Sequence, residues 1–200
     1  MITFKQFFTE AVNGKAAVFS YGRYNPPTTG HQLLIDKLTA TAKEKGADTF
    51  LIPTHTVDKK KNPLNVSEKI NILRQMSPGV TVLESGKTLV DALKDLQNRG
   101  YTTIYQVAGS DRIPEFTHIR DTYNNKPNKA GEIPFAFETY EIVSSGDRDP
   151  DSEGVEGMSA SKLRGFALAN DFNSFKEGMS SSVDDATKKT VFDIIRERLS

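Results

Sequence analysis

The feature that most constrains the fold of this chain is an alternation of short apolar runs with amphipathic stretches. The apolar runs have the length and the β-branched and aromatic content of strands, and they are KAAVFSY (15–21), ADTFLIPT (47–54), GVTVLES (79–85), YTTIYQVA (101–108) and PFAFETYEIV (134–143). Between the first two, Leu34, Leu38 and Thr41 recur at helical spacing before Gly46, a residue that favours a helix end. Repeated strand–helix units predict a parallel sheet with helices on both faces, because right-handed crossovers place helices there.

Three further helices follow from the same pattern. One is expected to be capped by Ser67, one carries Leu89, Leu93 and Leu96, and one starts at Pro114. The last third of the chain is helical around short loops, with a packing stripe of Val191, Ile194 and Ile195. We therefore predict an α/β, Rossmann-like domain over residues 1–200, with a five-stranded parallel sheet, a core over about 15–166 and a helical C-terminal region over 167–200.

Composition excludes several classes of function. The absence of Cys removes disulfides, thiolate zinc sites and cysteine nucleophiles. Lys plus Arg and Asp plus Glu are equal at 26 each, so no global field favours a nucleic acid or a membrane surface as partner. The N-terminus lacks the features of a secretory signal, and no run of about 18 apolar residues occurs. A cytoplasmic protein is expected, and its oligomeric state is left open.

The loop after the first strand could bind an anion, and its sequence is GRYNPPTTGH (22–31). It matches neither the dinucleotide pattern G-x-G-x-x-G nor the Walker pattern. It offers a glycine for close approach, two stiffening prolines and a helix N-terminus near Thr28 whose N–H groups favour anions. His31 would lie in the first helical turn, and the alternative is a turn with a surface histidine. In a parallel sheet, ligands bind beyond the carboxyl ends of strands, where this loop begins.

This loop resembles the first signature of the nucleotidyltransferase superfamily, [HT]-x-G-H, typically preceded by G-x-F-x-P. Tyr24 stands for the Phe, and Thr28 gives the Thr-containing form. The resemblance implies that Thr28 and His31 hold the phosphates of a nucleoside triphosphate. The other loop residues that it places at the nucleotide are Gly22, Arg23, Tyr24, Asn25, Pro26 and Gly30.

The segment GMSASKLRG (157–165) resembles the superfamily's second signature, I-S-[ST]-x-x-[IL]-R. Met158 replaces Ile, while Ser159, Ser161 and Arg164 stand at the family spacing. Hydroxyls and amides at such a helix start can bind a triphosphate, and Arg164 supplies a fork of donors for phosphate oxygens. Lys162 departs from the usual small or polar residue. The alternative is an ordinary helix capped by Ser159.

A third segment, VAGSDR (107–112), resembles the G-x-D segment that receives the nucleoside. Gly109 would allow close approach, and Asp111 could accept hydrogen bonds from sugar hydroxyls or an amino group. Asp111 could instead cap the following helix. Acceptor-binding residues are assigned more broadly, to His55, Lys59, Lys60, Lys61, Arg112 and Arg148. Three adjacent lysines are more often a solvated turn. The acidic stretch 146–157 is interpreted as a lid, with carboxylates that attract Mg²⁺ through water as the alternative.

The resemblance implies transfer of a nucleoside monophosphate, AMP favoured, from ATP or CTP to a phosphate-bearing small molecule, with release of pyrophosphate. Nicotinamide mononucleotide is the favoured acceptor, with Tyr24 and Phe116 as aromatics that could stack on a pyridine ring, and Mg²⁺ would arrive with the triphosphate rather than at a protein metal site. Phosphopantetheine adenylyltransferases and cytidylyltransferases are the alternatives within the superfamily. A non-catalytic nucleotide-binding phage protein is another, because FKQFFTEA (4–11) resembles the N-termini of tailed-phage proteins.

Overall fold

The computed structural model describes residues 14–146 and 158–199, which contain a five-stranded sheet of order β3-β2-β1-β4-β5. The strands are β1 (Lys15–Gly22), β2 (Asp48–Pro53), β3 (Thr81–Val82), β4 (Tyr101–Ala108) and β5 (Thr139–Ser144). Every neighbouring pair is parallel. The predicted Rossmann-like sheet is confirmed. The strand order reverses between β1 and β4, and this switch point is where open α/β sheets bind ligands.

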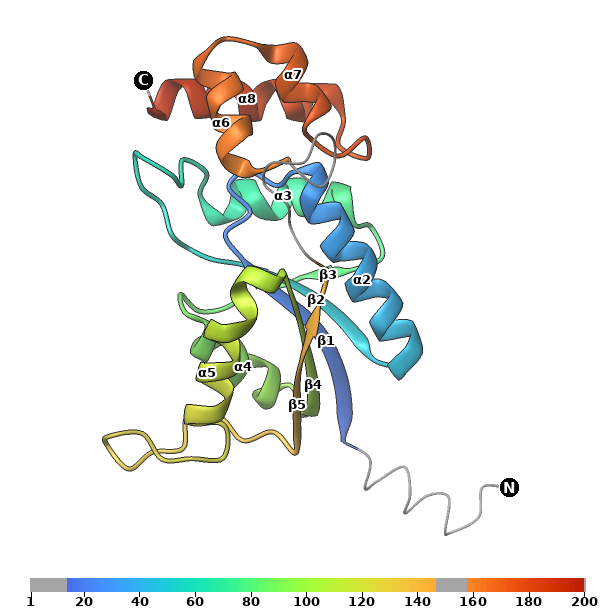
Figure 1. Ribbon diagram of the computed structural model, residues 1–200, viewed down its shortest axis with the longest axis vertical. Coiled ribbons are helices and arrows are strands. Elements are labelled where there is room, and N and C mark those ends of the chain that lie inside the picture. Colours follow the sequence, from blue (N-terminus) through green and yellow to red (C-terminus); the bar gives the residue numbers. More distant parts are fainter. Residues whose placement is uncertain (1–13, 147–157, 200) are drawn as a thin grey trace.

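Helices cover both faces of the sheet, as predicted (Figure 1). The helices are α2 (Thr29–Lys45), α3 (Val66–Met76), α4 (Leu89–Asn98), α5 (Ile113–Tyr123), α6 (Ala160–Leu168), α7 (Phe172–Glu177) and α8 (Asp185–Leu199). The pair α2 and α3 lies on one face and the pair α4 and α5 on the other, while α6, α7 and α8 gather together near α3 (Figure 1). In the described ranges, no helix has the length and apolarity needed to cross a bilayer.

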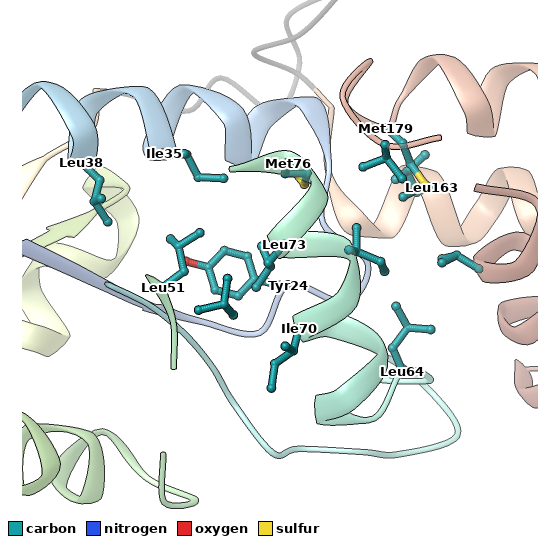
Figure 2. Packing of buried hydrophobic residues seen from close by; sticks show 14 of the residues in the cluster. Tyr24, Ile35, Leu38, Leu51, Leu64, Ile70, Leu73, Met76, Leu163 and Met179 are labelled. Carbon is teal, nitrogen blue, oxygen red and sulfur yellow. The ribbon is translucent and has the colours of Figure 1, made fainter. Parts of the chain in front are cut away.

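The core divides into two clusters, one on each side of the sheet. The cluster on the α2 and α3 side also contains Leu163 and Met179, which Figure 2 shows near Met76 and Leu73 of α3. The C-terminal helices therefore share their apolar core with the sheet domain. Of the predicted stripe on α8, Val191 and Ile195 are buried in this cluster and Ile194 packs against it.

Three element boundaries differ from the sequence prediction. The third strand, predicted over 79–85, spans only Thr81–Val82. The fifth strand begins only at Thr139, because the backbone of Phe137 is bound by the side chain of Asn124, at 2.8 and 3.1 Å, and not by a strand. The alternating apolar pattern over 134–138 instead reflects burial of Phe135 and Phe137 in the α4 and α5 cluster.

The cap of α3 is Asn65 and not Ser67. Asn65 Oδ1 accepts from the Glu68 N–H at 3.0 Å, and Glu68 Oε2 accepts from the Asn65 N–H at 2.8 Å. This reciprocal pair satisfies two backbone donors together, which a cap at Ser67 could not do with the residues that follow it.

Candidate active site

The segments that follow β1 and β4 meet the start of α6 at one cavity of about 910 Å³. The predicted residues that line it are Gly22, Arg23, Tyr24, Asn25, Gly30, His31, Lys61, Gly109, Asp111, Arg112, Ser159, Ser161 and Arg164. His31 and Arg164, 133 positions apart in the chain, thus lie at one cavity at the switch point of the sheet. Pro26, Met158 and Thr28, which were also placed at the nucleotide, do not line it.

The side chain of His31, in the first turn of α2, is held by the backbone of Thr28. Thr28 is the N-cap residue, and its N–H donates to His31 Nδ1 at 3.0 Å. Because Nδ1 accepts a hydrogen, the neutral imidazole carries its proton at Nε2. This is the tautomer that can donate a hydrogen bond to an anion while the other ring nitrogen fixes the orientation of the ring.

Thr28 lies behind the cavity wall. Its side chain is fully buried, and its hydroxyl donates to the Met158 carbonyl at 3.2 Å. The Thr29 N–H, one of the first amides of α2, donates to the Gly178 carbonyl at 3.0 Å. The prediction that Thr28 touches the phosphates is therefore corrected to a place in the supporting wall, because the hydroxyl already serves to join the two signature segments.

Arg164 is half-buried and held at two points. Its Nη1 donates to the Asn25 carbonyl at 2.8 Å, and its Nη2 donates to Ser161 Oγ at 2.9 Å. Burial lowers the pKa of Arg164, and the nearby guanidinium of Arg23 lowers it further. Crowding of cations favours a bound anion, since an anion relieves their repulsion. Ser159 does cap α6, accepting from the Lys162 N–H at 3.2 Å, and it lines the cavity as well.

The charge of the cavity is strongly one-sided. Arg23, Lys61, Arg112 and Arg164 line it, while Asp111 is the single acidic residue among its described lining residues. Across the described parts of the chain, no group of three or more His, Asp or Glu side chains is placed to hold a metal ion. The arrangement of the described lining residues suits a polyanion.

Another side of the cavity, where a nucleoside was predicted to bind, is formed by the end of β4. Gly109 precedes a one-turn 3₁₀ helix (Ser110–Arg112) that carries the exposed Asp111. The N-cap of α5 is Arg112 and has no side-chain cap hydrogen bond, so the structure gives no support to Asp111 as its cap. A Cβ at position 109 would lie 2.9 Å from Asp111 Oδ1, the end of an exposed side chain that could turn aside.

The two aromatics expected to stack on a pyridine ring are core residues. Tyr24 is 1% exposed, with its hydroxyl donating to Ser20 Oγ at 3.1 Å and its ring centroid 5.1 Å from that of His31. Phe116 is 3% exposed. Both residues border the cavity, but so little of either side chain is exposed that stacking on a pyridine ring has little surface to use.

The loop after β2 brings only part of its predicted residues to the cavity. Lys61 lines it, whereas Lys59, Lys60 and His55 do not. His55 Nε2 is buried without a hydrogen-bond partner among the described residues, while Thr54 and Thr56 line the cavity on either side. Side chains alternate along an extended segment, so those of residues 54 and 56 face one way and that of 55 the other. Arg148 and most of the acidic stretch lie outside the described residues.

Sequence reasoning missed Lys69, a fully buried lysine on α3. Its Nζ donates to the carbonyls of Thr54 at 2.8 Å and Thr56 at 3.2 Å, and burial lowers its pKa to about 8. The signal was present in the spacing, because Lys69, Leu73 and Met76 share the helical stripe that faces the core. It was missed because a lysine is ordinarily read as exposed.

Comparison with known proteins identifies a family and several structures of similar fold. The cytidylyltransferase-like family model matches residues 19–166. No curated protein sequence matches significantly. Among solved structures, Plasmodium falciparum nicotinic acid mononucleotide adenylyltransferase complexed with NaAD is 16% identical at a TM-score of 0.59, with 90% of this chain and 98% of that chain covered. A putative nicotinate-nucleotide adenylyltransferase from Vibrio parahaemolyticus is 16% identical at 0.54, with 88% and 98% covered.

Thermotoga maritima TmcAL bound with alpha-thio ATP is 14% identical at a TM-score of 0.54, with 92% of this chain and 56% of that chain covered. At such identities these structures share the fold with this chain. The family model spans both signature segments and the sheet between them. The chain belongs to the cytidylyltransferase-like family of the nucleotidyltransferase superfamily.

Proposed function

We propose that this protein transfers AMP from ATP to a phosphate-bearing small molecule, with nicotinamide mononucleotide as the favoured acceptor, and releases pyrophosphate. The observation that carries the proposal is the meeting of His31 and Arg164 at one cavity, whose described lining residues include four Lys and Arg residues and one carboxylate. That charge pattern suits two phosphate-bearing substrates bound together.

The proposed reaction is an in-line attack by an oxygen of the acceptor's phosphate on the α-phosphorus of the triphosphate. A bond forms between that oxygen and the α-phosphorus, and the bond from the α-phosphorus to the bridging oxygen of the pyrophosphate breaks. The acceptor phosphate is already an anion, so the step needs no general base. The protein's part is positioning and stabilisation of charge.

Each half of the anion site has its own task in this scheme. His31, with its proton at Nε2, donates to an oxygen on which charge grows. Arg164 offers its planar fork to the leaving pyrophosphate, and Lys61 and Arg23 balance the remaining charge. Gly109 and Asp111 would receive the nucleoside at the end of β4.

Magnesium enters the proposal only as a companion of the triphosphate. Asp111 is the one carboxylate among the described lining residues, so we expect a Mg²⁺ ion at this site to draw most of its ligands from the phosphates. A Mg²⁺ ion bound to the phosphates would add positive charge to the bound triphosphate.

Two similar structures are adenylyltransferases, which supports adenine as the base. The cytidylyltransferase-like family keeps cytosine as the alternative. A matrix of pyrophosphate release separates them: ATP and CTP, each against nicotinamide mononucleotide, nicotinate mononucleotide, phosphopantetheine and glycerol 3-phosphate. We expect release that depends on both substrates, greatest with ATP and nicotinamide mononucleotide. Nucleotide binding without release in any cell of the matrix would favour a non-catalytic nucleotide-binding protein.

A further inference from the structure

Asn25 stands where three distant segments meet. It is 2% exposed, and its side chain pairs with the backbone of Leu64: Nδ2 donates to the Leu64 carbonyl at 3.0 Å, and the Leu64 N–H donates to Oδ1 at 2.9 Å. Its own carbonyl accepts from Arg164 Nη1 at 2.8 Å. The loop after β1 is thereby joined to the segment before α3 and to the second signature on α6.

The segment before Leu64, to which Asn25 is bound, is held together by its own hydrogen bonds. Asp58 Oδ1 accepts from the N–H groups of Lys60 at 2.8 Å and Lys61 at 2.6 Å, and the Asp58 carboxylate also accepts from the Asn62 side chain. These hydrogen bonds hold the pKa of Asp58 well below its usual range. At the far end, Leu64 is fully buried in the cluster that Figure 2 shows around α3. The backbone position of Lys61 is therefore held relative to Leu64, three residues later.

Two cations of the cavity, Lys61 and Arg164, are thus both connected to Asn25 by hydrogen bonds. Lys61 is tied to Asn25 through Leu64 and the turn made by Asp58, and Arg164 is tied to the Asn25 carbonyl directly. Both cations line the cavity. One hydrogen of the Asn25 amide and one lone pair of its oxygen are engaged with Leu64, and Asn25 itself lines the cavity.

We propose that Asn25 is a positioning residue that sets the spacing of Lys61 and Arg164 around the bound phosphates. The proposal rests on the function proposed above, since it assigns those phosphates to the substrates. It predicts that loss of the Asn25 side chain acts on catalysis through Lys61, and not through a general loss of stability.

The chain supplies a matched control for this test. Asn124 makes the same two hydrogen bonds to a backbone, with Nδ2 donating to the Phe137 carbonyl at 3.1 Å and Oδ1 accepting from the Phe137 N–H at 2.8 Å. Asn124 does not line the cavity. Asn25→Leu and Asn124→Leu each remove two side-chain hydrogen bonds to a backbone, one pair at the cavity and one pair away from it. The Phe137 carbonyl keeps a second donor, Asn125 Nδ2 at 2.8 Å, so Asn124→Leu leaves fewer backbone groups unpaired.

The experiment measures kcat/KM for pyrophosphate release and the melting temperature of both variants. We expect both variants to melt at a lower temperature, with the smaller fall for Asn124→Leu. We expect kcat/KM to fall on the order of 10-fold to 100-fold for Asn25→Leu and to change within about twofold for Asn124→Leu. In the Lys61→Ala background, Asn25→Leu should lower kcat/KM only about twofold to threefold further, because the lysine that the side chain positions is gone. The backbone carbonyl that holds Arg164 is present in every variant. Equal losses at Asn25 and Asn124, or full additivity with Lys61→Ala, would overturn the proposal.

A binding measurement separates this proposal from the proposed function. Calorimetry with inorganic triphosphate probes the anion site without any turnover, and Asn25→Leu should weaken that binding about 10-fold while Asn124→Leu leaves it unchanged. A wild type that binds triphosphate but never releases pyrophosphate would refute the transfer reaction alone. A wild type that binds no triphosphate would refute both. If Asn25→Leu does not fold, Asn25→Asp keeps the acceptor for the Leu64 N–H, and wild-type triphosphate affinity in that variant would overturn the role of Asn25.

Discussion

The hydroxyl of Thr28 donates a hydrogen bond to the carbonyl of Met158, 130 residues later in the chain. Thr28 is also the residue whose N–H orients the ring of His31. Met158 immediately precedes Ser159, the N-cap of α6. Thr28, one buried residue, therefore connects the imidazole at the start of α2 through its N–H with the helix that carries Arg164 through its hydroxyl.

This connection predicts the behaviour of substitutions at Thr28. Thr28→Val keeps the shape of the side chain and removes the hydroxyl, so unfolding should become about 0.5–1.5 kcal/mol easier and pyrophosphate release should slow. Thr28→Ser keeps the hydroxyl and should recover most of the rate. Denaturant titration and steady-state rates on the same preparations check both. Wild-type turnover in Thr28→Val would mean that the two signatures hold their places without this bond.

His31 should separate catalysis from helix capping. His31→Ala should lose on the order of 10²-fold in turnover, because a donor to the transition state is removed. His31→Gln places a residue favoured at the third helical position, so it should recover helix stability while turnover stays far below that of the wild type. Steady-state pyrophosphate release and thermal unfolding measure the two effects. Recovery of full turnover by Gln would show that position 31 acts only as a cap partner.

Arg164 should depend on its geometry as well as its charge. Arg164→Ala should lose turnover to an extent similar to His31→Ala, since its fork faces the same cavity. Arg164→Lys should restore the activity only in part, because a lysine cannot reach the Asn25 carbonyl, Ser161 Oγ and a phosphate as one planar group. The rates of the two variants at saturating ATP decide the point. Complete restoration by Lys would reduce the role of Arg164 to simple charge.

Lys69 gives a prediction on pH and stability. Its pKa falls from 10.5 in the unfolded chain to about 8 in the folded protein, through burial. Between these two values the unfolded chain binds more protons, so this group makes the free energy of unfolding rise with pH, by at most about 1.4 kcal/mol per unit. Below pH 8 the buried ammonium contributes its full destabilisation.

The comparison variant is Lys69→Met, which keeps the apolar stem. The wild type should gain stability relative to Lys69→Met as the pH rises from 7 to 9.5, as measured by urea unfolding at both values. A difference between the two proteins that does not change with pH would contradict a depressed pKa at this site.

The parts of this structure that the sequence predicts are those governed by local pattern. The strands β1, β2 and β4 and the packing stripes of their helices follow from spacing, because each spacing reports which side of an element is buried. The meeting of His31 and Arg164 could be predicted because parallel strands bring their carboxyl ends to one edge of a sheet.

The errors concern side chains whose partners are distant in sequence. The strand predicted over 134–143 starts late because Asn124 takes the backbone of Phe137, and nothing near residue 137 in the sequence reveals that partner. Likewise, Tyr24 was assigned to a ligand and Lys69 was overlooked, because burial depends on the packing of α3 against the sheet. Residue type indicates what a side chain can do, and tertiary packing decides whether it is accessible.

The central claim is that an acceptor phosphate attacks the α-phosphorus of ATP and that pyrophosphate leaves. The most direct test follows ATP labelled at the α- or the γ-phosphate in the presence of Mg²⁺ and the four acceptors of the matrix. The account predicts that the α label enters a dinucleotide or equivalent phosphoanhydride and that the γ label leaves in pyrophosphate. A γ label on an acceptor, an α label in free AMP, or no movement of either label would contradict it.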